Sequence, residues 1–137
     1  MAFRVGVIGA GAWGTALAHL MASKGDEVTI WAYEAEVVEH INQHHENRTY
    51  LPEIELPRNL RATASLAESV AGADIVLLVT PSHVTRQVMI DLAPHLPERV
   101  PIVCATKGIE NDTLMTMCEV LEDVLPSRLV PDEKRGT

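Results

Sequence analysis

Short apolar runs alternate with amphipathic helical patterns along almost the whole of this 137-residue chain. The apolar runs occupy residues 3–8, 27–33, 60–63, 74–80 and 101–106. The helical patterns that follow them cover 13–24, 35–45, 65–72, 82–92 and 112–125. Neighbouring parallel strands need crossover connections, which are usually helices. The alternation therefore predicts an α/β fold, a Rossmann-type doubly wound parallel sheet in three α/β/α layers.

Several helices carry signals for their ends or their buried faces. Ser65 and Glu68 form a capping-box pattern, which predicts a helix that starts there and ends near Gly72. The last helix is expected to start at Asn111 or Asp112. Its inward face is predicted to hold Leu114, Met117, Cys118, Leu121 and Leu125. In the first helix, the residues predicted to share one face are Trp13, Ala16, Leu17, Leu20 and Met21.

The composition disfavours some classes of function. The net charge is −8 and the acidic residues are spread along the chain, whereas nucleic acid requires basic patches. No apolar stretch approaches membrane-spanning length, and glycines interrupt the N-terminal apolar run as they would not in a signal peptide. We therefore expect a cytoplasmic protein with no nucleic-acid or membrane partner. Cys104 and Cys118 lack a paired spacing and are expected to be reduced packing residues.

The histidines and serines do not form a recognisable metal or nucleophile pattern. His40 and His44 lie four residues apart on a predicted helix, but no acid accompanies them as in H-E-x-x-H. A solvated helix end explains them more simply, so no metal is expected. Ser82 and His83 are neighbours in sequence, which does not align a base with a nucleophile.

Three glycines, Gly9, Gly11 and Gly14, separate the first apolar run from the first helical pattern. G-x-G-x-x-G between a strand and a helix is typical of a dinucleotide site. Gly9 would permit the tight turn, Gly11 would let a pyrophosphate approach the backbone, and Gly14 would allow close packing of helix and strand. The helix N-terminus would then bind the anion. The alternative is a glycine-rich turn without a ligand.

The end of the second apolar run offers two candidate contacts for an adenosine ribose. Glu34 lies twenty positions after Gly14, where an acid favours an unphosphorylated ribose and hence NAD over NADP. Tyr33 could stack on adenine. The alternative for Glu34 is an acid that complements a helix dipole. NAD is the expected cofactor, with NADP as a second possibility.

Ligands of open α/β sheets bind beyond the carboxyl ends of the strands, and two further polar stretches fall there. They are TPSHV (80–84) and ATKGIE (105–110). Pro81 could simply end a strand, Ser82 could cap a helix, and His83 could be a surface residue. Lys107 is a cation after a buried strand, so it either faces the pocket or belongs to a solvated turn.

Five stretches together resemble the N-terminal domain of NAD(P)-dependent glycerol-3-phosphate dehydrogenase, from about Phe3 to Leu125. They are VIGAGAWGTALA (7–18), VTIWAYE (28–34), INQHHENRTYLP (41–52), VTPSHV (79–84) and ATKGIE (105–110). HEN-x-x-YLP and PSHV are more specific than the glycine pattern. The resemblance implies an oxidoreductase of glycerophospholipid metabolism, which interconverts sn-glycerol 3-phosphate and dihydroxyacetone phosphate by hydride transfer at a nicotinamide.

The resemblance also implies roles for individual residues. The dinucleotide loop falls on Gly9, Ala10, Gly11, Ala12, Trp13 and Gly14. The adenine-side residue falls on Tyr33, and the residue beside the nicotinamide falls on Val84 or its neighbours Pro81 to His83. The lysine that touches both cofactor and substrate falls on Lys107.

One departure from the family pattern concerns the end of the chain. The family continues with an S-G-P segment and a second, helical domain that supplies the catalytic lysine and the substrate-phosphate ligands. Here VPDEKRGT (130–137) stands in that place. We therefore expect residues 1–137 to be a cofactor domain with a frayed end at 125–137. It would contain no catalytic residue and would be inactive alone, although its parent enzyme would be a homodimer.

Two other functions would also explain the glycines. One is the dinucleotide domain of a β-hydroxyacid or 6-phosphogluconate type dehydrogenase, which shares the first strand-helix-strand unit. The other is a non-catalytic, NAD-sensing regulatory domain. The second leaves ATKG (105–108) and PSHV (81–84) without a role.

Overall fold

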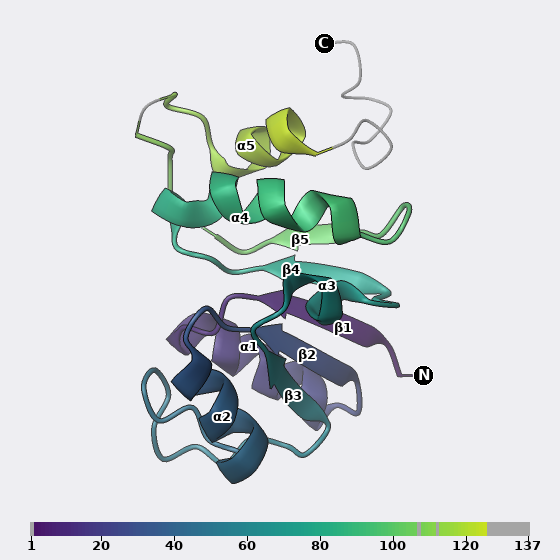
Figure 1. Cartoon of the computed structure of the whole chain (residues 1–137), viewed down its shortest axis with the longest axis vertical. Helices are drawn as coiled ribbons and strands as arrows, with labels where there is room; N and C mark the ends of the chain where they lie inside the picture. Colours follow the sequence, from purple (N-terminus) through teal and green to yellow (C-terminus); the bar gives the residue numbers. More distant parts are fainter. Residues whose placement is uncertain (1, 107, 112, 126–137) are drawn as a thin grey trace.

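The computed structural model describes residues 2–106, 108–111 and 113–125, and these form one sheet of five parallel strands. The strands are β1 (Arg4–Ile8), β2 (Glu27–Trp31), β3 (Leu60–Thr63), β4 (Ile75–Leu78) and β5 (Ile102–Cys104). The helices are α1 (Ala12–Ser23), α2 (Ala35–His44), α3 (Leu66–Val70), α4 (Thr85–Leu92) and α5 (Met117–Val124). Two short 3₁₀ turns flank α4, η1 (Ser82–Val84) and η2 (Ala93–His95). The predicted doubly wound fold is confirmed (Figure 1).

The strand order β3-β2-β1-β4-β5 places β1 at the centre of the sheet. Val7 lies opposite Ile30 of β2 and opposite Leu77 of β4. All neighbouring strands are parallel, so their carboxyl ends meet at one edge. From β1 the strand order runs outward in both directions, to β2 and β3 on one side and to β4 and β5 on the other. Ligands of such sheets bind at this switch point.

Side chains alternate between the two faces of the sheet, and each face has its own apolar core. One core contains Val5, Val7, Ala18, Val37 and Ile41. It is covered by α1 and α2. The other core contains Ile8, Val70, Leu78, Met89 and Leu121. It is covered by α3, α4 and α5, with α5 packed against α4 (Figure 1).

The buried face of α1 differs from the predicted face. Small residues form it, namely Gly14, Thr15, Ala18 and Ala22. Trp13 and Leu20 are 60% and 59% exposed, so their assignment to the inward face was wrong. Leu17 and Met21 pack only partly against the core. The physical reason is the close approach of α1 to the sheet, which admits small side chains and displaces large ones to the flanks.

The last helix begins later than predicted. Thr116 caps α5 with a reciprocal capping box to Glu119, so the prediction of Asn111 was wrong, and Asp112 lies outside the described residues. Residues before it form a turn instead, closed by a hydrogen bond from the Glu110 amide to the Met115 carbonyl at 2.8 Å. Leu114 adopts a left-handed φ of 61° in this turn and is exposed.

The start of α3 follows the sequence more closely. Ser65 Oγ accepts a hydrogen bond from the Glu68 amide and caps α3 as predicted, while the Glu68 carboxylate accepts one from Thr63 Oγ1. The exposure of Cys118 also differs from the prediction. Cys118 lies exposed on α5, so its assignment as a packing residue was wrong. Among the described residues, none of the helices has the length and apolarity needed to span a membrane.

Candidate functional site

A groove of about 1110 Å³ runs along the carboxyl edge of the sheet. The glycine turn after β1 forms its floor, and the segments after β2, β4 and β5 form its walls. The predicted cofactor contacts found among its lining residues are Gly9, Ala10, Gly11, Ala12, Trp13, Gly14, Tyr33, Glu34, Pro81 and Val84. Ser82 and His83 line it too. The fold thus brings together segments that are far apart in sequence, from Gly9 after β1 to Thr106 after β5. Lys107 lies outside the described residues.

The three glycines meet three different spatial requirements. Gly9 has a φ of 124°, and a Cβ there would lie 2.5 Å from the Val79 carbonyl oxygen. Gly14 faces the Gly9 carbonyl so closely that a Cβ would collide with it. At Gly11, by contrast, an added Cβ would meet nothing within 4 Å. Gly9 and Gly14 are therefore required by the protein itself, whereas Gly11 leaves backbone open to the groove.

Helix α1 starts at this open position. Gly11 is its N-cap, and the first turn carries amide donors for which an α-helix has no internal acceptors. The helix dipole adds partial positive charge at the same end. Such an end binds anions without needing a cationic side chain, which agrees with the overall negative charge of the chain.

Asn47, a buried residue that is not among those lining the groove, supports the glycine turn, a role that the sequence analysis missed. Its side-chain amide donates to the Ala10 carbonyl at 2.9 Å and to Thr15 Oγ1 at 2.8 Å. Asn47 and Thr15 are both fully buried. Asn47 Oδ1 accepts a hydrogen bond from the Tyr50 amide at 3.1 Å, which ties the turn to the loop after α2. The HEN-x-x-YLP motif contains both Asn47 and Tyr50.

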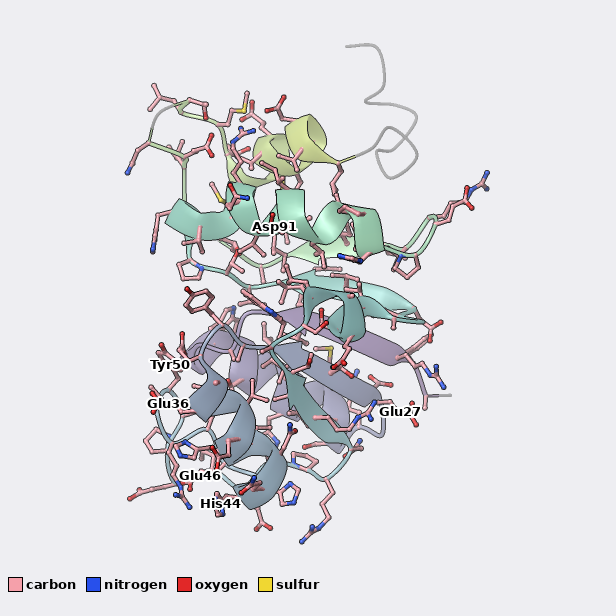
Figure 2. All side chains as sticks on the ribbon, in the orientation of Figure 1. Glu27, Glu36, His44, Glu46, Tyr50 and Asp91 are labelled. Carbon is pink, nitrogen blue, oxygen red and sulfur yellow. The ribbon has the colours of Figure 1, made fainter. Side chains whose placement is uncertain are left out.

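Tyr33 and Glu34, just after β2, both line the groove but differ in exposure. Tyr33 is 83% exposed, while Glu34 is half-buried and is the N-cap residue of α2. A hydrogen bond to Glu34 raises the pKa of the Tyr50 hydroxyl above its usual value, with a smaller effect from Glu36. Figure 2 shows Tyr50 and Glu36 on the same side of the molecule. Tyr50 is therefore a groove residue close to Glu34, which the sequence analysis did not predict.

The segment after β4 enters α4 through the η1 turn. Val84 is the N-cap residue of α4, so Ser82 does not cap this helix. Thr85 Oγ1 donates to the Pro81 carbonyl at 3.0 Å and forms a second hydrogen bond with Thr80 Oγ1 at 2.9 Å. These bonds fix the backbone of 80–85 where it lines the groove.

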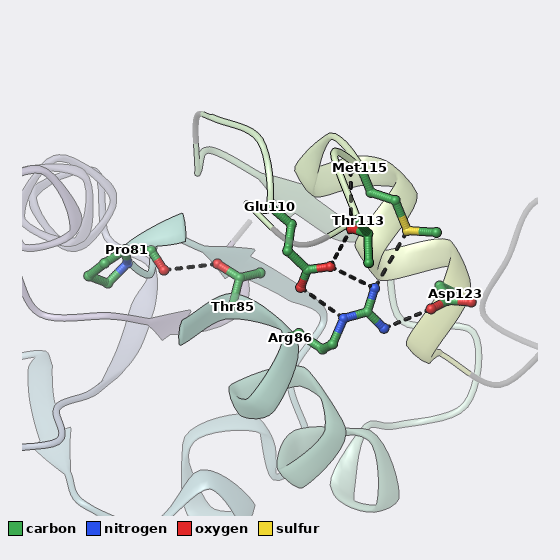
Figure 3. Close-up of polar contacts among 7 residues, drawn as sticks. All are labelled: Pro81, Thr85, Arg86, Glu110, Thr113, Met115 and Asp123. Carbon is green, nitrogen blue, oxygen red and sulfur yellow. Dashed lines mark hydrogen bonds and ion pairs between the residues drawn. The ribbon is translucent and has the colours of Figure 1, made fainter. Parts of the chain in front are cut away.

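An ion-pair cluster anchors the loop after β5 (Figure 3). Arg86 Nε and Nη2 donate to the two Glu110 carboxylate oxygens at 2.8 and 3.0 Å, and Nη1 donates to Asp123 at 2.7 Å. The guanidinium of Arg86, followed by the Thr113 hydroxyl, holds the pKa of Glu110 below its usual range. The loop after β5, which begins with Ala105 and Thr106, is thus tied to α4, and residues of both line the groove.

Other reactive groups contribute no site of their own. Burial raises the pKa of the Cys104 thiol, which makes a thiolate at neutral pH less accessible. No cluster of three histidine, cysteine or acidic side chains that could hold a metal ion is found in the described part of the chain. Among the described residues, the polar groups of the groove are therefore backbone amides, hydroxyls, the carboxylates of Glu34 and Asp91, the Gln87 amide and the His83 imidazole.

A central parallel sheet with a glycine turn at a helix N-terminus defines a Rossmann-type domain. The chain belongs to the family of NAD-dependent glycerol-3-phosphate dehydrogenase, whose N-terminal domain matches residues 4–131. The resemblance read from the sequence is thereby confirmed.

Individual relatives agree with this assignment. The chain is 52% identical over 128 residues to glycerol-3-phosphate dehydrogenase, NAD(P)+, of Anaeromyxobacter dehalogenans, covering 93% of this chain and 39% of the relative. The identity to the enzyme of the same name from Geobacter sulfurreducens is 54%, covering 92% and 38%. The crystal structure of glycerol-3-phosphate dehydrogenase from Coxiella burnetii superposes with a TM-score of 0.84 at 32% identity, covering 90% of this chain and 38% of that one. The chain thus spans less than half the length of these relatives.

Proposed function

We propose that the groove binds NAD and that residues 1–137 are the cofactor domain of an NAD(P)-dependent glycerol-3-phosphate dehydrogenase. The observation that carries this proposal is the open backbone at Gly11, where an added Cβ would meet nothing within 4 Å. Beside it, the first turn of α1 presents unpaired amide donors and positive partial charge. A pyrophosphate group fits both the space and the field.

The ribose end of the ligand would lie against Glu34. A carboxylate there accepts hydrogen bonds from the two ribose hydroxyls and repels a 2′-phosphate, which favours NAD over NADP. Tyr50 lines the groove together with Glu34, and Glu34 raises the pKa of its hydroxyl. Tyr33, exposed beside it, offers a ring face to the base.

The nicotinamide end would lie between the segments after β4 and β5. Pro81 and Val84 line one wall, and Ala105 and Thr106 line the other. When bound there, the cofactor would supply or accept the hydride exchanged between dihydroxyacetone phosphate and sn-glycerol 3-phosphate, which differ by that hydride and a proton. The chain's own residues orient the ring and exclude water from one of its faces. Lys107, next to Thr106 in sequence, is proposed to touch both cofactor and substrate.

The remaining parts of the family reaction are proposed from the resemblance and from the greater length of the relatives. A catalytic lysine and the ligands of the substrate phosphate would come from a second, helical domain. The whole enzyme would act as a homodimer in the cytoplasm.

Titration of the chain with NADH, followed by tryptophan fluorescence, tests the dinucleotide site. Gly11 has a φ of −71° and a ψ of −174°, which valine can adopt, so Gly11→Val should fold normally. Its side chain would occupy the place of the pyrophosphate and weaken binding by at least about tenfold, or about 1.4 kcal/mol. Ser23→Val, at the other end of α1, is the control. Unchanged NADH affinity in folded Gly11→Val would contradict the proposal.

A further inference from the structure

The groove does not end at Tyr33 but continues into a second hollow of about 430 Å³ between β2, α3 and α4. The residues shared by the groove and this second hollow are Trp31, Tyr33, Leu66 and Asp91. A ligand that passes the Glu34 carboxylate can therefore extend toward α4 without leaving the protein surface.

The walls near this junction suit a flat aromatic base. The Trp31 indole is held by a hydrogen bond from Nε1 to the Ala64 carbonyl at 3.1 Å. Leu66 at the start of α3 and Val88 of α4 supply further apolar surface, and Val88 is 9% exposed. A planar ring gains from contact with such fixed apolar walls.

Asp91 is the one carboxylate among the described residues that line the second hollow. It lies on the exposed side of α4, where Figure 2 labels it, one turn after Gln87. Gln87 Nε2 donates to Asp91 Oδ1 at 3.1 Å, which orients the carboxylate. The other polar side chains of the hollow are Ser65, Tyr33 and His95, and Ser65 Oγ already accepts from the Glu68 amide.

We propose that Asp91 selects the adenine base of the dinucleotide by accepting a hydrogen bond from its 6-amino group. This inference rests on the proposed function, because it requires the pyrophosphate at Gly11 and the ribose at Glu34. A carboxylate is an acceptor only, so it pairs with an amino group and is left facing another acceptor when the base carries a 6-oxo group. Asp91 thus discriminates between purines at the end of the groove farthest from the hydride.

The test compares NADH with reduced nicotinamide hypoxanthine dinucleotide, which differs from it only in the base. Wild-type chain should bind NADH more tightly by about fivefold, because a site built to pair an amino group rejects the analogue that lacks it. In Asp91→Asn, an isosteric change at an exposed position, the amide can offer either a donor or an acceptor. The ratio of the two affinities should fall to about one. Glu98→Gln, whose residue lines neither hollow, should keep the wild-type ratio.

The possible failures are distinguishable. If the wild-type chain does not bind NADH at all, the dinucleotide site itself is wrong. If it binds both dinucleotides equally, or if Asp91→Asn keeps the wild-type preference while its thermal midpoint is unchanged, the role of Asp91 is overturned. A loss of preference in His95→Ala but not in Asp91→Asn would likewise overturn it and assign the base contact to His95.

Discussion

The side-chain amide of Asn47 donates to the carbonyl oxygen of Ala10 at 2.9 Å across 37 positions of sequence. Ala10 lies inside the glycine turn, and Asn47 lies in the loop after α2. The same amide reaches Thr15 in the first turns of α1. The turn that borders the groove is therefore held in shape by a buried residue from a separate part of the chain.

Asn47→Ala should lower both stability and NADH affinity. It leaves the buried Ala10 carbonyl and Thr15 hydroxyl short of a donor, which costs about 1–3 kcal/mol of the free energy of unfolding. The Ala10 carbonyl then keeps only the longer hydrogen bond from Thr15 Oγ1, at 3.3 Å, so the glycine turn is held less firmly in the shape that accepts an anionic ligand. Urea denaturation and NADH titration measure the two effects. Asn111→Ala, at an exposed turn position, is the control and should change neither. Lost stability with full NADH affinity would show that Asn47 does not set the shape of the turn.

Gly14→Ala should separate the structural glycines from the ligand-facing one. The new Cβ would collide with the Gly9 carbonyl oxygen and approach the Val79 Cβ to 3.5 Å. Overpacking of this kind costs about 1–3 kcal/mol of the free energy of unfolding. Gly11→Ala is the matched control, because its Cβ enters open space and its backbone angles suit alanine. Equal unfolding midpoints for the two variants would contradict this division of roles.

The Glu34 carboxylate should set the preference between NADH and NADPH. In wild type the 2′-phosphate would face a carboxylate with no adjacent arginine, so NADPH should bind more weakly. Glu34→Gln should reduce that preference by roughly fivefold, about 1 kcal/mol, as for an exposed charge pair. Calorimetric titration at moderate salt measures both affinities. Glu36→Gln, in the first turn of α2 and outside the lining of the groove, is the control. Equal wild-type affinities would show that Glu34 points away from the ribose.

The Arg86–Glu110 ion pair should make stability depend on pH in the acid range. The pKa of Glu110 is lowered in the folded chain, chiefly by its hydrogen bond from Arg86. A lowered folded-state pKa adds stability above the unfolded-state value of about 4.5, and this stability is lost as the pH falls through the folded-state value. Wild type should therefore exceed Glu110→Gln in stability at neutral pH, and the two should converge below pH 4.5.

Urea denaturation at a series of pH values from neutral to acid checks this convergence. Glu98→Gln removes an exposed carboxylate away from Arg86 and should follow wild type throughout. A stability difference between wild type and Glu110→Gln that stays constant on acidification would show that the pair contributes through packing and not through charge.

Local sequence signals predicted the sheet and the glycine turn because short-range patterns determine both. The spacing of Gly9, Gly11 and Gly14 after an apolar run predicts a turn between a strand and a helix from neighbouring residues alone, and the structure has that turn between β1 and α1. Buried faces were predicted less well. Trp13 fits a helical period but is displaced from the sheet, because small residues allow α1 to approach it closely.

Long-range contacts explain what the sequence could not show. Asn47 and Tyr50 belong to the HEN-x-x-YLP motif, yet only the folded chain brings Asn47 to Ala10 of the glycine turn and Tyr50 close to Glu34. The same holds for Asp91, whose position at the groove depends on how α4 packs against α3. Near α5, the sequence analysis expected the cap at Asn111 or Asp112, whereas the structure forms a capping box between Thr116 and Glu119. The Glu110 amide instead bonds to the Met115 carbonyl ahead of the helix.

The chain alone should bind NADH without reducing dihydroxyacetone phosphate. Hydride transfer to a ketone leaves an alkoxide that must be protonated, and loss of the general acid typically costs about 10² to 10⁴ in rate. The family resemblance assigns the acid and the substrate-phosphate ligands to a second domain, and the curated relatives are more than twice as long as this chain. Without those ligands, substrate orientation is lost too, a contribution of about 7–11 kcal/mol at its limit.

Measurement of NADH oxidation by the pure chain checks this, with the same chain joined to its natural downstream sequence as the positive control. We expect activity only in the longer protein. The proposed function gives Lys107 a positioning role at cofactor and substrate, so Lys107→Ala should weaken the longer enzyme without removing its proton donor. Turnover by the 137-residue chain, abolished by Lys107→Ala, would overturn the prediction and make Lys107 the acid.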